Sequence, residues 1–217
     1  MGGAPRRRGR RLLNDTDLRD RVHARLDAVG APWVDEVQVG DVRVDVVALL
    51  GGRLTAIELK SAKDTLTRLG DQYAACERLF PQVVVAAAAR HVEGVQAIVG
   101  PRCGIWVAEE APGGVHLRVR SRRAGTRAPK PRPRAKQARL AHYLRRAELL
   151  AILGLPPEAA LRKPAAAQRV LAAHPGPELE ALVFAALRAR KLAGDSPKPH
   201  LTSAGMPVTT TGDTPCG

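Results

Sequence analysis

Two apolar segments joined by a pair of glycines constrain the fold of this chain more than any other feature. Residues 42–50 are rich in valine, residues 53–60 form a second apolar segment, and Gly51-Gly52 stand between them. Consecutive glycines readily adopt the positive φ angles that a two-residue hairpin turn requires. The sequence therefore predicts an antiparallel β-hairpin over residues 42–60.

The segments on either side of this hairpin predict an α/β fold. Asn14 or Asp15 can cap a helix whose apolar residues recur at helical spacing and which stops at Gly30. The other elements are expected in the order strand, helix, strand, short helix, strand and strand, over residues 33–39, 63–80 (capped by Asp64), 83–87, 91–99, 104–108 and 115–119. A strand–helix–strand unit beside a hairpin implies a mixed central sheet flanked by helices.

The second half of the chain differs in composition. Residues 120–137 are rich in Arg, Lys and Pro and have no apolar period, which is typical of an extended linker. Helical spacing returns over residues 138–153, 165–173 and 178–192. We therefore expect a disordered basic arm (1–13), an α/β domain (14–119), a basic linker (120–137), a small helical appendage (138–193) and a disordered tail (194–217).

Three charged residues interrupt the apolar hairpin. Asp45 lies between valines in its first strand, and Glu58 and Lys60 lie in its second strand. Side chains alternate along a strand, so Glu58 and Lys60 share one face, while the neighbours of Glu58 point toward apolar packing on the other. The glycine turn brings Asp45 beside Glu58. Because a buried charge is costly unless it is paired or binds a metal, these residues indicate a functional site.

The chemistry that suits these residues is metal-assisted hydrolysis. Two carboxylates and a backbone carbonyl are the oxygen ligands that Mg²⁺ or Mn²⁺ prefers. Such an ion lowers the pKa of a bound water and stabilises charge on a phosphoryl oxygen. A lysine ammonium beside the ion can orient that water or serve as a base. The alternative is an inert sheet in which Asp45, Glu58 and Lys60 form ion pairs.

The same residues resemble a known family. Asp45, followed after twelve residues by Glu58-Leu59-Lys60, is similar to the D…(D/E)-x-K signature of the PD-(D/E)XK nuclease superfamily. The expected order of elements is similar to the restriction-endonuclease-like core of that superfamily. Three segments resemble a bacterial and phage subgroup related to MmcB-like DNA repair proteins and RecB-type nuclease domains: RVD at 43–45, IELKSAKDTLTRL at 57–69 and GIWV at 104–107. The resemblance covers residues 14–119, and a weaker one lies in RAELL at 146–150.

The resemblance implies a metal site and a catalytic lysine. It implies that Asp45, Glu58 and the backbone carbonyl of Leu59 bind Mg²⁺ or Mn²⁺. It also implies that Lys60 positions or activates the attacking water. Relatives with an Fe–S cluster need four cysteines and this chain has three, so no Fe–S cluster is expected.

Two further positions match the resemblance in part. Glu36 matches an early acidic position that can bind the metal through water, and its alternative is a charge at a strand end. Gln72 matches the glutamine of a Q-x-x-x-Y element, which contacts metal-bound water or a DNA phosphate, and its alternative is a solvated helix residue. The tyrosine position of that element holds Cys76 here. Arg43 is expected to be a charge partner for the acidic cluster.

The positive charge of the chain is confined to two segments. The formal net charge is +14, from 35 Lys and Arg against 21 Asp and Glu. Residues 1–13 contain five arginines and residues 118–146 contain twelve Lys and Arg, without an acid in either segment, and the remaining chain is mildly acidic. We expect the second segment to bind DNA phosphates, and its alternative is a solvated connector. The residues expected to bind DNA are Arg118, Arg120, Arg122, Arg123, Arg127, Lys130, Arg132, Arg134 and Lys136.

These patterns predict a metal-dependent deoxyribonuclease that acts in DNA repair or in phage- or defence-related DNA processing. The main alternative is a non-catalytic DNA-binding accessory module that keeps the nuclease fold, and RNA stays open as a substrate. No apolar run approaches the roughly 18–20 residues of a membrane span, and no signal-peptide core follows the N-terminus. Three widely spaced cysteines make no disulfide framework, so we expect a cytoplasmic protein that binds no membrane. Protein partners and oligomeric state stay open.

Overall fold

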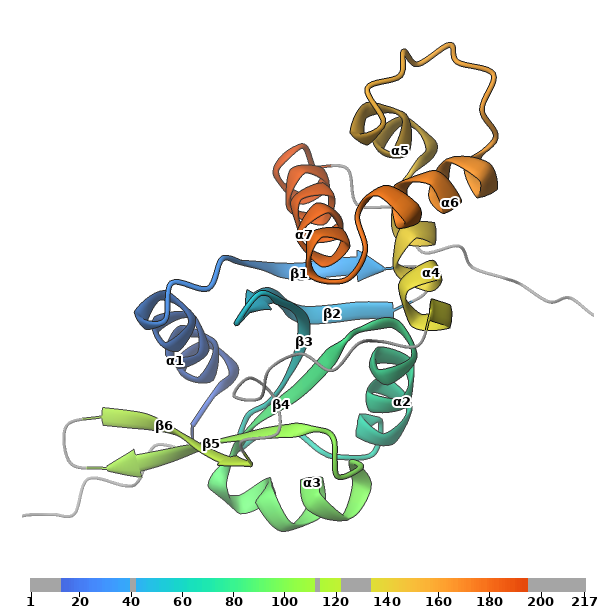
Figure 1. The fold of residues 1–217 in the computed structure, drawn as a ribbon. Helices are drawn as coiled ribbons and strands as arrows, with labels where there is room; N and C mark the ends of the chain where they lie inside the picture. Colours follow the sequence, from blue (N-terminus) through green and yellow to red (C-terminus); the bar gives the residue numbers. More distant parts are fainter. Residues whose placement is uncertain (1–12, 40–41, 112–113, 122–133, 195–217) are drawn as a thin grey trace, which may run out of the picture.

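A six-stranded mixed sheet forms the centre of the molecule in the computed structural model, which describes residues 13–39, 42–111, 114–121 and 134–194 (Figure 1). The strands lie side by side in the order of the sequence. They are β1 (Trp33–Val39), β2 (Val42–Leu50), β3 (Arg53–Lys60), β4 (Gln82–Ala88), β5 (Gly104–Ala111) and β6 (Gly114–Ser121). The pairs β3–β4 and β4–β5 are parallel, and the other three pairs are antiparallel. The mixed sheet predicted from the sequence is confirmed.

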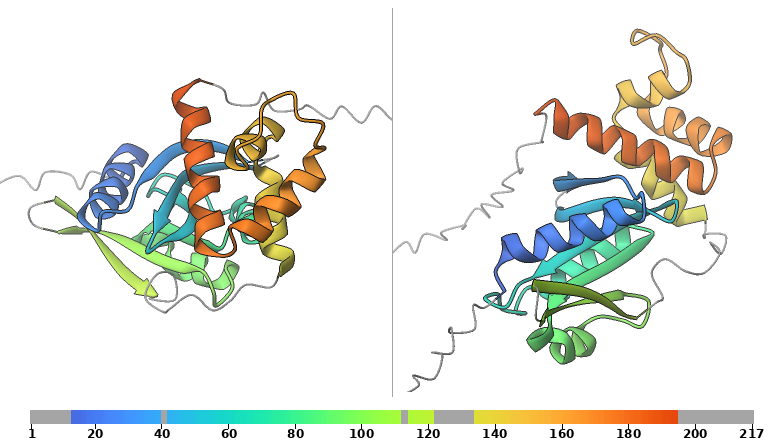
Figure 2. Two further views of the ribbon diagram at one scale, coloured as in Figure 1. Left: turned by 45° about the horizontal axis from the view of Figure 1, so that its top comes forward. Right: turned by 90° about the vertical axis from the view of Figure 1, so that its left-hand side faces the viewer.

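Helices cover both faces of this sheet (Figure 2). On one face, α1 (Asp15–Ala28) packs its buried leucines and valine against side chains of β2, β3, β4 and β5. On the opposite face, a larger core joins the sheet to α2 (Leu69–Leu79), α3 (Val92–Ile98) and the C-terminal helices. The C-terminal helices are α4 (Arg134–Tyr143), α5 (Arg146–Ile152), α6 (Lys163–Ala173) and α7 (Pro177–Leu192), and a short 3₁₀ turn, η1 (Ala89–His91), precedes α3.

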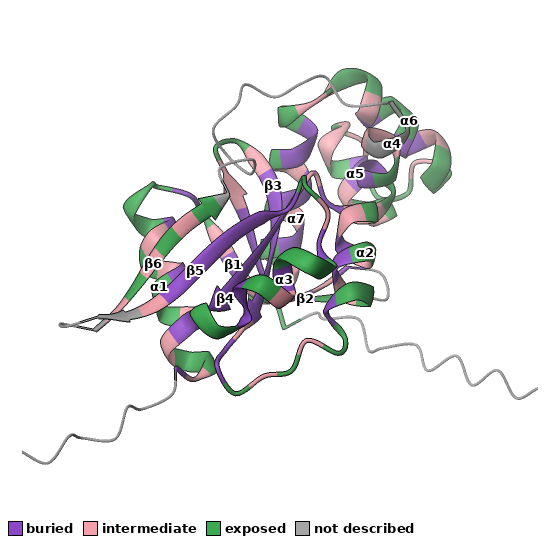
Figure 3. Cartoon of the chain, turned by 90° about the horizontal axis from the view of Figure 1, so that it is seen from below, coloured by how far each residue is buried: buried purple, intermediate pink, exposed green. Residues whose placement is uncertain are grey.

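The glycine turn and the Asn14 cap predicted from the sequence are present in the structure. Gly51 and Gly52 have φ angles of 58° and 73°, as a two-residue hairpin turn between β2 and β3 requires. Asn14 is the cap of α1, because its side chain accepts a hydrogen bond of 2.8 Å from the backbone N–H of Asp17. β4 and most of β5 are buried, as parallel strands between two layers of helices should be (Figure 3).

The helix predicted over residues 63–80 begins only at Leu69, so the first part of that prediction is wrong. Asp64 does not cap it, because its carboxylate accepts the backbone N–H of Ser61 at 2.6 Å and so holds the turn that follows β3. The apolar pattern of the helix seemed to continue back to Leu66 because this leucine packs against the core, although it lies in the segment before the helix. A Cβ at Gly94 would lie 2.6 Å from Leu66 Cδ1, so the leucine occupies the space that a side chain on α3 would need.

The helix predicted over residues 138–153 is two helices, α4 and α5. α4 begins at Arg134, inside the segment predicted as a linker, and the break follows Tyr143. At the break, the carboxylate of Glu148 accepts the backbone N–H of Arg145 at 2.6 Å, which caps the start of α5. The N-terminal end of the predicted linker also differs, because β6 continues to Ser121.

The C-terminal helices are packed on the sheet. α7 contacts β1, β2 and β3, and its apolar residues belong to the same core as α2. Glu180 of α7 is only 1% exposed. Its carboxylate accepts hydrogen bonds from the backbone N–H of Leu54 at 2.8 Å and from Arg53 Nε at 3.2 Å, which ties α7 to the start of β3. In the described ranges no helix has both the length and the apolar character to cross a bilayer.

Candidate functional site

The regular pairing of the sheet is interrupted at Asp45. Asp35 pairs with Val46 and Val37 with Val44, which places Glu36 of β1 opposite Asp45 of β2. Glu36 has a φ angle of 52°, a left-handed conformation that residues with a side chain seldom adopt. The sheet therefore carries a local irregularity in two neighbouring strands at the same level, a feature that is frequent at functional sites.

This irregularity reverses the alternation of side chains along β2. Val44 belongs to the core beneath α2, whereas Val46 belongs to the core beneath α1 on the opposite face. Strict alternation would place both valines on one face. Asp45 thus lies at the point where the alternation of side chains between the two faces shifts by one residue. The pattern of apolar residues in the sequence does not reveal this shift.

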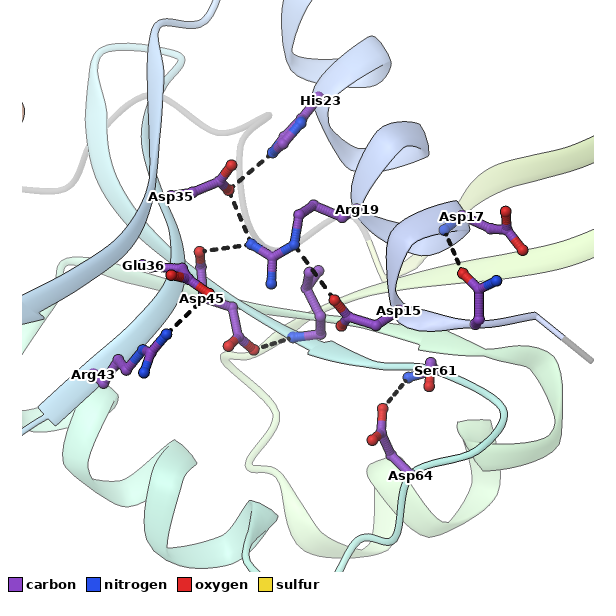
Figure 4. Close-up of polar contacts among 12 residues, drawn as sticks. Asp15, Asp17, Arg19, His23, Asp35, Glu36, Arg43, Asp45, Ser61 and Asp64 are labelled. Atoms are coloured by element: carbon purple, nitrogen blue, oxygen red, sulfur yellow. Dashed lines mark hydrogen bonds and ion pairs between the residues drawn. The ribbon is translucent and has the colours of Figure 1, made fainter.

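Both the backbone and the side chain of Asp45 have partners outside the regular ladder (Figure 4). Its carboxylate Oδ2 accepts the backbone N–H of Leu59 at 2.9 Å. Its carbonyl oxygen accepts Nη1 of Arg19, on α1, at 3.2 Å. The regular register of β2 with β3 runs from the hairpin turn only as far as Val46 and Ile57. Asp45 is therefore held beside β3 by its side chain.

Glu58 is the buried centre of the site and has no exposed surface. Gln72 of α2 donates from Nε2 to Glu58 Oε2 at 3.1 Å and accepts from Lys60 Nζ, through Oε1, at 2.8 Å. Cys76, one turn further along α2, places its Sγ donor 3.7 Å from Glu58 Oε1. The prediction that Glu58 and Lys60 share a face is confirmed, and α2 supplies two side chains that link to them.

The electrostatics of the site centre on Glu58. Burial is the main cause that raises the pKa of Glu58 to about 7, and the nearby carboxylate of Asp45 is the second. The charge of Lys60 opposes the shift. Burial also raises the pKa of the Cys76 thiol, and the charge of Glu58 raises it further, so Cys76 is a neutral hydrogen-bond donor. Near neutral pH the pair of carboxylates therefore holds a proton or needs another positive charge.

Glu36 lies opposite Asp45, but its carboxylate pairs with Arg43. Its carboxylate is 2.9 Å from Arg43 Nη2 in an exposed ion pair, and its backbone carbonyl accepts Lys191 Nζ at 3.4 Å. The sequence predicted that Arg43 is a charge partner for the acidic cluster of Asp45 and Glu58, whereas in the structure it pairs with Glu36. The predicted water-mediated role of Glu36 stays a prediction.

The donor set at Asp45 and Glu58 suits a divalent cation that keeps water ligands. Nowhere in the described part of the chain do three His, Cys, Asp or Glu side chains lie close enough together to hold a metal ion. A cation here would therefore rely on Asp45, Glu58, the carbonyl of Leu59 and water. Mg²⁺ is commonly bound in this way, by one or two carboxylates with several waters retained. A cation bound at this site would supply the positive charge that the proton on Glu58 otherwise supplies.

The residues predicted to bind DNA are described only in part. Arg118 and Arg120 are exposed on β6, and Arg118 Nη2 lies 2.7 Å from Glu109 Oε1. Pairing across the sheet runs from Lys60 through Ala87 and Val107 to Arg118, so Arg118 faces the same side as Lys60 at the same level. Arg134 and Lys136 lie in α4, whereas Arg122, Arg123, Arg127, Lys130 and Arg132 lie outside the described residues.

A second polar network, which the sequence pattern did not predict, lies beside the site. Arg19 Nη1 and His23 Nε2, both from α1, lie 3.1 Å and 2.9 Å from the same oxygen of Asp35 on β1. The His23 ring stacks on Trp33 with a centroid distance of 3.7 Å. The available signal was the pair of adjacent acids, Asp35 and Glu36, within an apolar strand. Spacing alone gave no indication that α1 covers Asp35.

Comparisons with known proteins identify a family. A family model described as bacteriophage P4 protein cII matches residues 25–190. A solved structure, described as SPO1766 protein of unknown function from Silicibacter pomeroyi, is similar with 17% sequence identity, covers 85% of this chain and 92% of its own, and has a TM-score of 0.45. No curated protein matches the chain. Since the family model spans well over half of the sequence, the chain belongs to the bacteriophage P4 protein cII family.

Proposed function

We propose that the protein is a metal-dependent nuclease of the PD-(D/E)XK type that hydrolyses phosphodiester bonds in DNA. The observation that carries the proposal is the pairing of Asp45 with the fully buried Glu58 at the break in the sheet, with Lys60 on the same face. Two neighbouring carboxylates destabilise a sheet unless a positive charge joins them. A divalent cation bound at this site would supply that positive charge.

Each residue would have a distinct task. A bound Mg²⁺ or Mn²⁺ would lower the pKa of its water and stabilise charge on the phosphate under attack. Asp45, Glu58 and the Leu59 carbonyl would hold the ion. Lys60 Nζ, fixed by its hydrogen bond to Gln72, would donate to the attacking water and orient it. Gln72 also binds Glu58, so α2 fixes the lysine and the carboxylate relative to each other.

The arrangement of the chain supports the PD-(D/E)XK assignment and DNA as substrate. The order α1, β1, β2, β3, α2, β4 is similar to the core of that superfamily, and its motif residues meet at one place in the sheet. Arg118 lies on the same face and level as Lys60, so DNA phosphates could extend from the site toward β6 and the basic residues that follow. The bacteriophage name of the family is compatible with a role in phage DNA processing.

The test is cleavage by the purified full chain in Mg²⁺, in Mn²⁺ and in EDTA. Substrates are single-stranded, double-stranded, nicked and branched DNA, with RNA of the same sequences alongside. Glu58→Ala and Lys60→Met should each lower the cleavage rate by at least about 100-fold, because the first removes a proposed metal ligand and the second removes the group that would position the water. Glu93→Ala is the matched control, since Glu93 is an exposed acid on α3. If the wild type and Glu58→Ala give the same background, the protein is not this nuclease.

A second candidate is a non-catalytic DNA-binding accessory module with the same fold. It is favoured by the burial of Glu58, whose two carboxylate oxygens already have partners in Gln72 and Cys76. Calorimetric titration with Mg²⁺, in parallel with DNA-binding measurements, separates the two functions. A protein that binds DNA, releases no heat with Mg²⁺ and cleaves no substrate is the accessory module.

A further inference from the structure

Arg19 connects α1 to the irregular part of β2 at Asp45. Its Nη1 donates both to the carbonyl oxygen of Asp45, at 3.2 Å, and to Asp35 Oδ1, at 3.1 Å (Figure 4). Its Nε lies 3.5 Å from Asp15 Oδ2, one turn earlier on the same helix. The side chain is 19% exposed, so the guanidinium lies largely between α1 and the sheet.

The bond from Arg19 matters because it satisfies the backbone carbonyl at the irregular position in β2. Asp45 is half-buried, and a carbonyl that is shielded from water and has no partner costs up to about as much as a lost hydrogen bond. Asp45 is held at two points, by Arg19 at its carbonyl and by the N–H of Leu59 at its carboxylate. A movement of that carbonyl would turn the peptide and change the distance between the carboxylates of Asp45 and Glu58.

The Arg19 guanidinium is itself held by Asp35 of β1. Asp35 accepts hydrogen bonds at the same oxygen from Arg19 and from the ring of His23. The His23 ring lies nearly parallel to Trp33, with an interplanar angle of 10°, and this stacking restrains it. A planar guanidinium held by a fixed carboxylate presents its remaining donors in one orientation. The guanidinium that donates to the Asp45 carbonyl is therefore held in place by Asp35.

We propose that Arg19 is a positioning residue, which holds the backbone of Asp45 so that its carboxylate faces Glu58. Asp35 fixes Arg19 in turn. The catalytic consequence of this inference rests on the proposed nuclease function, whereas the position of the Asp45 carboxylate does not. The N–H of Leu59 reports that position directly, because it donates to Asp45 Oδ2.

The first experiment measures hydrogen exchange of the Leu59 amide by NMR, without metal or DNA, relative to the amides of β4. Arg19→Met keeps the aliphatic stem and removes the donors, and Arg19→Lys keeps one charged donor. Arg21→Met is the control, because Arg21 is exposed on the same helix. Relative protection at Leu59 should fall at least tenfold in Arg19→Met, fall less in Arg19→Lys and stay constant in Arg21→Met. Unchanged relative protection in a folded Arg19→Met protein overturns the proposal.

The second experiment separates positioning from substrate contact. In a wild type that cleaves DNA, Arg19→Met should lower kcat at least tenfold and leave KM for DNA within twofold, because Arg19 acts through Asp45. A raised KM with unchanged kcat would show direct contact with DNA and overturn the positioning role. If the wild type cleaves nothing, the nuclease proposal fails, and the Leu59 amide still decides the role of Arg19.

Discussion

Replacing Glu58 by glutamine should stabilise the fold at neutral and alkaline pH. Burial and the neighbouring Asp45 carboxylate raise the pKa of Glu58 from its ordinary value of 4.5 to about 7. Since one pKa unit corresponds to 1.36 kcal/mol, this shift is worth about 3 kcal/mol. Glutamine has the shape of the protonated acid, and its amide oxygen can accept a hydrogen bond from Gln72 or Cys76.

The sign follows from the number of protons that each state binds. In the unfolded chain Glu58 loses its proton near its ordinary pKa, whereas in the folded protein it keeps the proton until about pH 7. Between these values the folded state binds more protons, so the free energy of unfolding of the wild type falls as pH rises. The glutamine variant has no such proton to lose. Its advantage in unfolding free energy should therefore grow by about 3 kcal/mol between pH 4.5 and roughly pH 8.

Urea and thermal denaturation in EDTA across this pH range measure the difference. For a chain of this size 1 kcal/mol corresponds to roughly 2–4 °C, so the difference in Tm should grow by about 6–12 °C. Glu93→Gln, at an exposed position on α3, should follow the wild type at every pH. Parallel curves for the wild type and Glu58→Gln would refute the assignment of a buried, proton-holding carboxylate.

Adding Mg²⁺ extends the same measurement to the proposed metal site. At about pH 8 the ion should replace the missing proton and stabilise the wild type, by about 2.7 kcal/mol when its concentration is 100 times its Kd. Glu58→Gln removes one of the two carboxylates and should gain far less. Equal stabilisation of both proteins by Mg²⁺ would contradict a metal site at Glu58.

Three further predictions concern other parts of the molecule. Glu180→Gln should lower the free energy of unfolding in urea by about 3 kcal/mol, because it breaks a buried pair with Arg53, and a loss below 1 kcal/mol would contradict this. His91→Leu should raise it by about 1 kcal/mol, since the buried His91 Nε2 has no hydrogen-bond partner among the residues that the structure describes, and a clear loss would reveal one. Replacing both Arg118 and Arg120 by Gln should reduce the slope of log K for DNA against log salt by about 2, measured by fluorescence anisotropy, and an unchanged slope would place the DNA elsewhere.

The parts of the site that depend on local periodicity were predictable. Gly51-Gly52 fixed the hairpin, and alternation along β3 placed Glu58 and Lys60 on one face, because both signals act over a few residues. Gln72 was found through a family motif, and the structure brings it into hydrogen-bond contact with both residues. The catalytic and metal-binding roles of these residues stay predictions.

What the sequence did not reveal depends on contacts between distant segments. The change of phase at Asp45 follows from its partners on α1 and β3, so the apolar pattern around it is misleading. Arg19 borders the apolar face of α1, and the sequence pattern does not show which groups of the sheet its side chain reaches. The late start of α2 has the same origin, because Leu66 joins the core from a turn beside Gly94. In each case tertiary packing overrides a local pattern.

The sequential order of the strands bears on how the protein folds while it is being synthesised. Each strand lies beside its predecessor, so the sheet can assemble as the nascent chain leaves the ribosome. α7, however, packs over β1, β2 and β3 and is the last helix in the described part of the chain. Arg53 and Glu180 are separated by 127 positions. At a synthesis rate of about 5–20 residues per second, part of the apolar face of the first strands stays exposed for roughly 6–25 s before α7 is made. A chain released before α7 would keep that face open and would be prone to aggregate.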